Sequence, residues 1–158
     1  MINDLRGKAV LITGGTMGIG LATALSFARQ GAVAWMTHRW GSADEDAIFK
    51  LFADEGLAKP HIVQADVANK DDTAALLEQM KAHHDHVEAF ISNVSFGLVV
   101  EKLEDYRLSS LFRSIEYSTW PMYQYSHDIH KLFGRWPRYV IGLSSGGPDH
   151  FYKNYDFV

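Results

Sequence analysis

Short apolar runs alternate along the chain with longer segments in which apolar residues recur at helical spacing. The runs at 8–13, 32–38, 61–66, 87–93 and 138–145 are rich in β-branched and aromatic residues and predict strands. The segments at 19–30, 43–55, 71–82 and 104–133 predict helices. The third of these helices is expected to start at an aspartate cap, and Pro121 is expected to kink or bound the last one.

This alternation of strands and helices favours an α/β fold, a doubly wound parallel sheet built from right-handed βαβ units. A chain of 158 residues fits one such domain. Ligands of parallel sheets bind beyond the carboxyl ends of the strands. Gly14, Asp66, Asn93 and Ser145 all follow predicted strands. We therefore expect the functional residues to gather at that edge.

Composition and charge narrow the class of protein. A net charge of −4 gives no basic footprint for nucleic acid, and the absence of cysteine removes disulfides and thiolate metal sites. The first residues carry charges where a signal peptide needs an apolar run, and no apolar stretch approaches about 18 residues. These features predict a soluble, cytoplasmic protein that binds neither nucleic acid nor membrane.

The stretch TGGTMGIG at 13–20 joins the first predicted strand to the first predicted helix. Gly14 allows a tight turn, while Gly18 and Gly20 remove Cβ atoms where a pyrophosphate or a strand must approach the backbone. The exposed N–H groups and the helix dipole favour an anion. A plain tight turn is the alternative, but the position between strand and helix favours nucleotide binding.

With T-G-x-x-x-G-I-G the chain resembles the short-chain dehydrogenase/reductase family. The resemblance continues through ADV at 65–67, where Asp66 matches the acidic residue near the adenine ring, and through Asn93, where the family's N-A-G motif follows the fourth strand. It implies a Rossmann fold and an oxidoreductase that uses a nicotinamide cofactor. It also implies cofactor contacts from Gly14, Thr16, Met17, Gly18, Ile19, Gly20, Asp66, Val67 and Asn93.

The end of the second strand decides between the two nicotinamide cofactors. An acidic residue there binds the ribose of NAD, whereas a basic residue accommodates the 2′-phosphate of NADP. This chain has His38 in the acidic position, followed by Arg39, whose guanidinium suits a phosphate, and Ser42 could donate another hydrogen bond. NADP(H) is the predicted cofactor, and a solvated surface arginine is the alternative. Met17 stands where many NADP-preferring relatives have a basic residue.

The resemblance also implies a proton-transfer site. In the family a tyrosine exchanges a proton with the substrate oxygen, a lysine lowers its pKa and a serine orients the substrate. Ser145 matches that serine, with Tyr152 seven and Tyr155 ten residues later, both closer than the family's common spacing. Asn154-Tyr155 looks like the pair in NADPH-using enoyl-acyl carrier protein reductases of the third class. Ser145 and Tyr155 are the predicted catalytic residues.

Other segments agree with that branch or leave alternatives open. The stretch SNVSFG at 92–97 departs from the common motif as those enzymes do, and we expect Ser95 and Tyr152 to line a substrate pocket. Arg113 or Ser114 stands where common reductases have a fourth-helix asparagine, which puts the standard proton relay in doubt. The histidines at 83–86 predict no metal site, because consecutive side chains point in different directions.

The resemblance implies further segments after Tyr155, including the helix with the catalytic lysine, and 156–158 contains no lysine. We expect 1–158 to be a single NADP-binding domain truncated after the active-site tyrosine, without the C-terminal part of the usual fold, and as given either a fragment or an inactive form. Two functions stay open: an NADPH-dependent reductase of a carbonyl or conjugated enoyl thioester, and a catalytically inactive nucleotide-binding or regulatory member. In the family the fourth helix builds a subunit interface, so the resemblance implies a homo-oligomer, a dimer or a tetramer, and the aromatic run at 117–125 is expected to pack in the core or in that interface.

Overall fold

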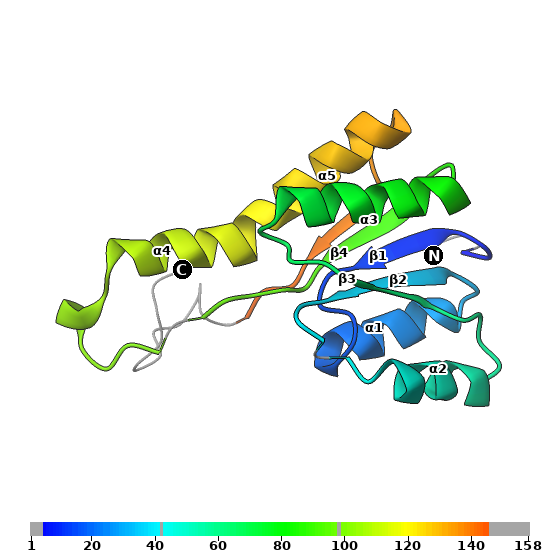
Figure 1. Cartoon of the computed structure of the whole chain (residues 1–158), viewed down its shortest axis with the longest axis horizontal. Helices are drawn as coiled ribbons and strands as arrows, with labels where there is room; N and C mark the ends of the chain where they lie inside the picture. Colours follow the sequence, from blue (N-terminus) through cyan, green and yellow to red (C-terminus); the bar gives the residue numbers. More distant parts are fainter. Residues whose placement is uncertain (1–4, 42, 98, 146–158) are drawn as a thin grey trace.

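A computed structural model describes residues 5–41, 43–97 and 99–145 of the chain. Its centre is a five-stranded parallel sheet in the order β3-β2-β1-β4-β5 (Figure 1). The strands are β1 (Ala9–Ile12), β2 (Val33–His38), β3 (His61–Gln64), β4 (Val87–Ser92) and β5 (Tyr139–Gly142). The five predicted strands and the doubly wound parallel sheet are thereby confirmed.

Helices cover both faces of the sheet (Figure 1). The helices are α1 (Gly18–Ala28), α2 (Glu45–Asp54), α3 (Lys70–His83), α4 (Leu108–Ser114) and α5 (Trp120–Phe133), with a 3-10 turn η1 at Leu103–Asp105. α1 and α2 lie on one face, and α3 and α5 lie on the other (Figure 1). None of the described helices has both the length and the apolar character needed to span a membrane.

The central strand β1 supplies both layers of the core, because successive side chains of a strand point to opposite faces. Val10 and Ile12 pack in the cluster that contains the apolar side chains of α1 and α2. Ala9 and Leu11 pack in the second cluster, with side chains of α3 and α5. All four side chains are fully buried. Two-sided burial explains why 8–13 is an almost unbroken apolar run rather than an alternating one.

The third helix begins one residue earlier than predicted and with a different cap. The side chain of Asn69 accepts hydrogen bonds from the backbone N–H groups of Asp71 (2.9 Å) and Asp72 (3.3 Å), so the helix starts at Lys70. The predicted aspartate cap is therefore wrong. Asp71 and Asp72 instead lie in the first helical turn, where their carboxylates are stabilised by the helix dipole.

The segment 104–133 is not one continuous helix. After η1 and α4 comes a π-helical stretch, η2 (Ile115–Thr119), and α5 then begins with Pro121 in its first turn. A proline has no N–H, and its ring crowds the carbonyl of the residue four positions earlier, which here is Tyr117. A wider π turn relieves that contact. The predicted local break at Pro121 is confirmed, with the break lying in the turn just before it.

Three imidazoles surround the buried indole of Trp35 in β2. The indole Nε1–H donates a hydrogen bond to His84 Nε2 at 3.1 Å, which requires His84 to be neutral. The ring of His61 stacks on the indole with centroids 3.8 Å apart, and His83 lies 5.8 Å from it. Burial, followed by the charge of neighbouring His83, lowers the pKa of both His61 and His84. The neutral rings are thus the form that the fold stabilises.

Acid should therefore weaken the fold through these rings. In the unfolded chain a histidine takes up a proton near about pH 6.5, whereas in the folded chain His61 and His84 take it up only at lower pH. The unfolded chain therefore binds more protons in this range, so the free energy of unfolding should fall from about pH 7 to about pH 5. His61→Phe keeps an aromatic ring on Trp35 but cannot titrate, so its fall should be smaller. Urea unfolding, monitored by circular dichroism at each pH, measures the free energy of unfolding of the wild type and of the variant. The exposed His127→Phe is the control, and an equal change in both variants would contradict the assignment.

Candidate functional site

The turn between β1 and α1 lies at the carboxyl edge of the sheet and holds the predicted glycine loop. Gly14 and Gly18 adopt positive φ angles of 62° and 51°, which side chains other than glycine rarely accept. Nothing lies within 4 Å of the position that a Cβ of Gly18 would take, so the backbone there faces open space. The loop can therefore present its N–H groups to a ligand.

Gly20 has a different role, which is close packing. A Cβ at this position would lie 2.1 Å from the carbonyl oxygen of Gly14 and 2.8 Å from the side-chain nitrogen of Asn93. The first turn of α1 is thus pressed directly onto the loop that precedes it. Any larger residue at position 20 has to displace backbone, because a carbonyl oxygen cannot rotate away as a flexible side chain can.

Asn93, directly after β4, fastens the loop to the sheet. Its side-chain Nδ2 donates hydrogen bonds to the carbonyl oxygens of Thr13 and Gly14, both at 3.0 Å. Its backbone N–H donates to Thr13 Oγ1 at 3.1 Å, and that hydroxyl donates to the carbonyl of Ile91 at 3.3 Å. The predicted site residue Asn93 therefore acts on the loop backbone, turning the loop's carbonyls toward the sheet.

A second brace comes from Thr37 in β2, which the sequence did not single out. The N–H of Gly14 donates to Thr37 Oγ1 at 3.2 Å, and the N–H of Gly15 donates to the carbonyl of Thr37 at 3.0 Å. A Cβ on Gly15 would lie 2.8 Å from the side chain of Met36. The strand next to β1 thereby fixes the first half of the loop and leaves the second half open.

The open half is the N-terminus of α1. Met17 is the N-cap residue, and its side chain makes no capping hydrogen bond. The cap residue therefore offers no acceptor to the first N–H groups of the helix, which is the arrangement that binds anions at helix N-termini. Met17 and Ile19 are 67% and 70% exposed, while Thr16 is buried. Of the predicted residues 16–20, only Met17, Gly18 and Ile19 are exposed at this helix end, because Gly20 is buried as well.

At the end of β2, Arg39 is held by its neighbours. Its Nε lies 2.9 Å from Oδ2 of Asp66, although the N–H is not aligned on that oxygen, so the contact is an ion pair without hydrogen-bond geometry. The guanidinium carbon lies 3.6 Å from the ring centroid of Trp40 and 5.1 Å from that of Tyr117. Trp40 is 75% exposed and has a φ of 53°, unusual for a bulky residue. Arg39 is thus held between the carboxylate of Asp66 and the ring of Trp40.

Asp66, after β3, is fixed from several directions. Its backbone N–H donates to Asp72 Oδ2 at 2.9 Å, and its own Oδ1 accepts from the N–H of Ala68 at 3.0 Å. The hydroxyl of Tyr117 lies 3.5 Å from its Oδ2. Tyr117 belongs to the π-helical stretch and is a contact that the sequence did not indicate. The carboxylate therefore has a fixed orientation toward Arg39.

Two residues predicted to contact the cofactor, His38 and Val67, have buried side chains. The side chain of His38 is 5% exposed, lies 3.8 Å from Glu45 through Nε2, and has no hydrogen-bond partner at Nδ1 among the described residues. Val67 packs in the core cluster with α3 and α5. Any contact of Val67 with a ligand would therefore come from its backbone.

The predicted substrate and proton-transfer residues are only partly within the described ranges. Ser145 is exposed and follows β5, where the N–H of Leu143 donates to the carbonyl of Ser92 at 3.0 Å. Ser145 is thus on the same edge as the glycine loop. Ser95 is exposed next to Phe96, which exchanges hydrogen bonds with Ser118. Ser42, Tyr152 and Tyr155 lie outside the described residues.

Comparisons with known proteins agree with this geometry. The chain is 27% identical over 120 residues to an NADPH-dependent aldehyde reductase from Arabidopsis thaliana, covering 71% of this chain and 42% of the relative. It is 32% identical over 98 residues to the tetrahydroxynaphthalene reductase PfmaG from Pestalotiopsis fici, covering 62% and 35%. The chain spans less than half the length of these curated relatives.

Solved structures show the same fold. A crystal structure of the NADH-dependent reductase A1-R′ complexed with NAD superposes with a TM-score of 0.80 at 22% identity, covering 98% of this chain and 66% of that one. The family model for short chain dehydrogenases matches residues 8–133, from the start of β1 to the end of α5. The chain therefore belongs to the short-chain dehydrogenase/reductase family of oxidoreductases.

Proposed function

We propose that the chain carries the cofactor half of an NADPH-dependent short-chain reductase, which transfers hydride to a carbonyl or conjugated enoyl carbon. The observation that carries the proposal is the uncapped N-terminus of α1, opened by the positive φ angles of Gly14 and Gly18 and braced by Asn93. This arrangement fits a pyrophosphate. When bound, the nicotinamide supplies the hydride, and the chain's residues bind and orient the reactants.

Within this proposal the loop residues hold the diphosphate through their backbone, and Asp66 and Val67 border the adenine. Met17, Gly18 and Ile19 form the exposed surface at the helix end, and the buried Thr16 and Gly20 flank them. Because Asn93 turns the carbonyls of Thr13 and Gly14 toward itself, these lone pairs are directed away from the bound anion. The repulsion that such carbonyls would otherwise exert on a phosphate is reduced.

Arg39 is the proposed contact to the 2′-phosphate, next to His38 at the end of β2. Its ion pair with Asp66 uses Nε, so the two terminal Nη groups can still engage a phosphate. Stacking on Trp40 holds the guanidinium plane in place and limits the rotamer entropy lost on binding. NADH is the competing cofactor, because the solved relative A1-R′ is an NADH-dependent reductase complexed with NAD.

Arg39→Ala tests the cofactor preference. Loss of a charge-assisted contact should weaken NADPH binding about 10- to 100-fold and leave NADH nearly unchanged. Fluorescence titration with both cofactors measures the two dissociation constants. Arg29→Ala is the matched control, because Arg29 is a surface arginine at the far end of α1 that pairs with Glu55. Equal losses for NADPH and NADH would refute the 2′-phosphate contact.

For proton transfer we propose Tyr155 as the acid and Ser145 as the group that orients the substrate oxygen, with Ser95 and Tyr152 bordering the substrate. The position of Ser145 after β5, on the edge that holds the glycine loop, supports this assignment. A tyrosine has a pKa of about 10, so nearby positive charge has to lower it before it can serve at neutral pH. The spacing of Ser145 and Tyr155 favours an enoyl thioester over a simple ketone.

Tyr155→Phe should lower kcat by about 10²- to 10⁴-fold while NADPH affinity is retained, because only the proton donor is lost. NADPH oxidation with a panel of ketones and a crotonyl thioester measures turnover, and Tyr152→Phe is the control, expected to change KM more than kcat. Unchanged turnover in Tyr155→Phe would remove the assigned role. A chain that binds NADPH and reduces none of these compounds is the alternative, a catalytically inactive nucleotide-binding member.

We also propose that the protein is a dimer or tetramer built on α4, which extends past the sheet, and on the first turn of α5 (Figure 1). Phe112, Trp120 and Tyr123 on these helices are 60%, 48% and 57% exposed, an apolar surface that a neighbouring copy would cover. Light scattering should give a multiple of the monomer mass of 17.8 kDa, and Phe112→Glu should shift it toward the monomer. A monomeric wild-type chain would reject the proposal.

A further inference from the structure

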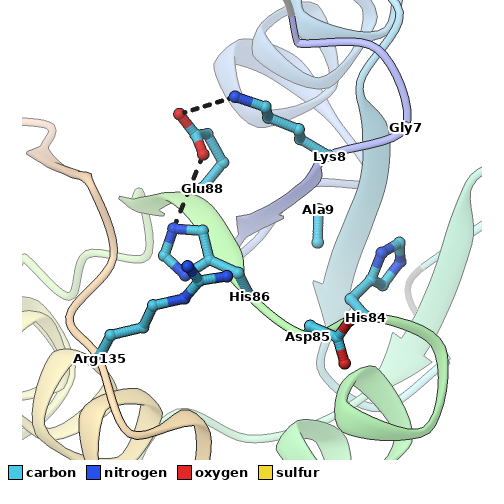
Figure 2. Close-up of a pocket in the computed structure, with 8 residues that line it drawn as sticks. All are labelled: Gly7, Lys8, Ala9, His84, Asp85, His86, Glu88 and Arg135. Atoms are coloured by element: carbon cyan, nitrogen blue, oxygen red, sulfur yellow. Dashed lines mark ion pairs between the residues drawn. The ribbon is translucent and has the colours of Figure 1, made fainter.

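A cavity in the described part of the chain lies at the end of the sheet where β1 and β4 begin. Its volume is about 310 Å³, and it is lined by Gly7, Lys8, Ala9, His84, Asp85, His86, Glu88 and Arg135 (Figure 2). The glycine loop lies at the other ends of these strands, one strand length away, or roughly 20 Å for six residues. Nothing in the proposed cofactor site uses these residues. The cavity is at the small end of the range for ligand pockets.

Glu88 is the fixed point of this cavity. Its side chain is 5% exposed, and three groups approach it: the cations Lys8 Nζ at 3.4 Å and Arg138 Nη1 at 3.5 Å, and the imidazole Nε2 of His86 at 3.7 Å. Figure 2 shows Lys8 and His86 both directed at the carboxylate. All three separations are long for direct hydrogen bonds, and Glu88 Oε1 accepts none among the described residues. A buried carboxylate oxygen in this state favours a further donor.

Arg135 brings a positive charge that is not neutralised within the described part of the chain. It follows α5, lines the cavity and forms none of the ion pairs there. Figure 2 shows its guanidinium next to the ring of His86, whose Nδ1 is buried and without a hydrogen-bond partner among the described residues. Burial, and then the charge of Arg135, lower the pKa of His86, so the ring tends to be neutral and able to accept or donate.

The charges and hydrogen-bonding groups of this cavity are complementary to one class of ligand. The lining itself is balanced, with Lys8 and Arg135 against Asp85 and Glu88. Arg138 pairs with Glu88 from outside the lining and gives the region one cation in excess, which favours an anion. Glu88 Oε1 has two cations nearby but accepts no hydrogen bond among the described residues, so an anion that carries its own hydrogen-bond donor avoids repulsion by this carboxylate. A protonated phosphoryl group combines both, since its oxygens accept from a guanidinium or an ammonium while its P–OH donates to a carboxylate. Sulfate has the same size and charge but no O–H at neutral pH.

We propose that this cavity is a binding site for a hydrogen phosphate group, with its oxygens on Arg135 and Lys8 and its P–OH donated to Glu88. Inorganic phosphate and a small phosphomonoester share this chemistry. Binding here would be separate from binding at the glycine loop.

Isothermal titration calorimetry on the whole chain with inorganic phosphate and with sulfate tests the proposal. Phosphate should bind in the millimolar range and at least about tenfold more tightly than sulfate, because Glu88 repels an anion that cannot donate. Arg135→Gln should weaken phosphate about tenfold. Lys131→Gln removes the same charge one turn earlier, from an exposed position outside the cavity, and should change little.

Glu88→Gln gives the sharpest result. An amide can donate to sulfate, so this near-isosteric variant should abolish or reverse the preference for phosphate, and its circular dichroism shows whether it is folded. The proposal is overturned by the absence of phosphate binding, by equal losses in Arg135→Gln and Lys131→Gln, or by an unchanged preference in folded Glu88→Gln. Phosphate bound only at the glycine loop would appear as binding that Arg135→Gln does not alter, which also overturns it.

A parallel titration with glycerol phosphate separates the two sources of the ligand. If glycerol phosphate binds more tightly than inorganic phosphate and retains the dependence on Arg135, the cavity takes a phosphorylated small molecule. If it binds more weakly, the cavity takes free phosphate. Both results require the same contacts with Glu88 and Arg135, so both support the assignment of the site.

Discussion

The hydrogen bonds from the side chain of Asn93 to the carbonyls of Thr13 and Gly14 are the contacts on which the functional edge depends. They join the end of β4 to a loop 79 and 80 residues earlier in the chain. They hold two carbonyls of the loop against the sheet, and Thr37 accepts from the N–H groups of Gly14 and Gly15, so the donors left open are those of the second half, at the start of α1. The same amide nitrogen sits against Gly20, where even a methyl group would come within 2.8 Å of it. Loop conformation, helix position and polarity of the edge are therefore set together.

Much of this edge could be predicted from the sequence because its determinants are local. The glycines at 14, 18 and 20 lie within one turn, and their spacing between a strand and a helix indicated both the turn and its ligand class. The strands could be predicted equally well, because the strands of a sheet that is buried on both faces are unbroken apolar runs such as that at 8–13. The cap of α3 was misassigned, since Asn69 and the aspartates after it are all good capping residues and only the backbone geometry decides among them.

Other features depend on contacts between distant parts of the chain. Thr37 braces the glycine loop only because β2 pairs with β1, and nothing in its local sequence distinguishes it from another strand threonine. Tyr117 reaches Asp66 from a π turn, a geometry that no periodicity reveals. The same holds for Glu88, an acidic residue within an apolar strand that meets its cations only when β1, β4 and the segment after α5 come together.

The pair formed by Arg39 and Asp66 has a thermodynamic consequence for any ligand at the end of β2. The guanidinium is not a free cation waiting for a phosphate, since a carboxylate lies 2.9 Å from its Nε. A ligand anion therefore shares Arg39 with Asp66 or replaces Asp66 as its partner. The binding free energy gained is the difference between the contact of Arg39 with the anion and its contact with Asp66. The preorganised arginine gives the anion a defined geometry, while the carboxylate limits the net affinity. Selectivity at this position is thereby favoured over tight binding.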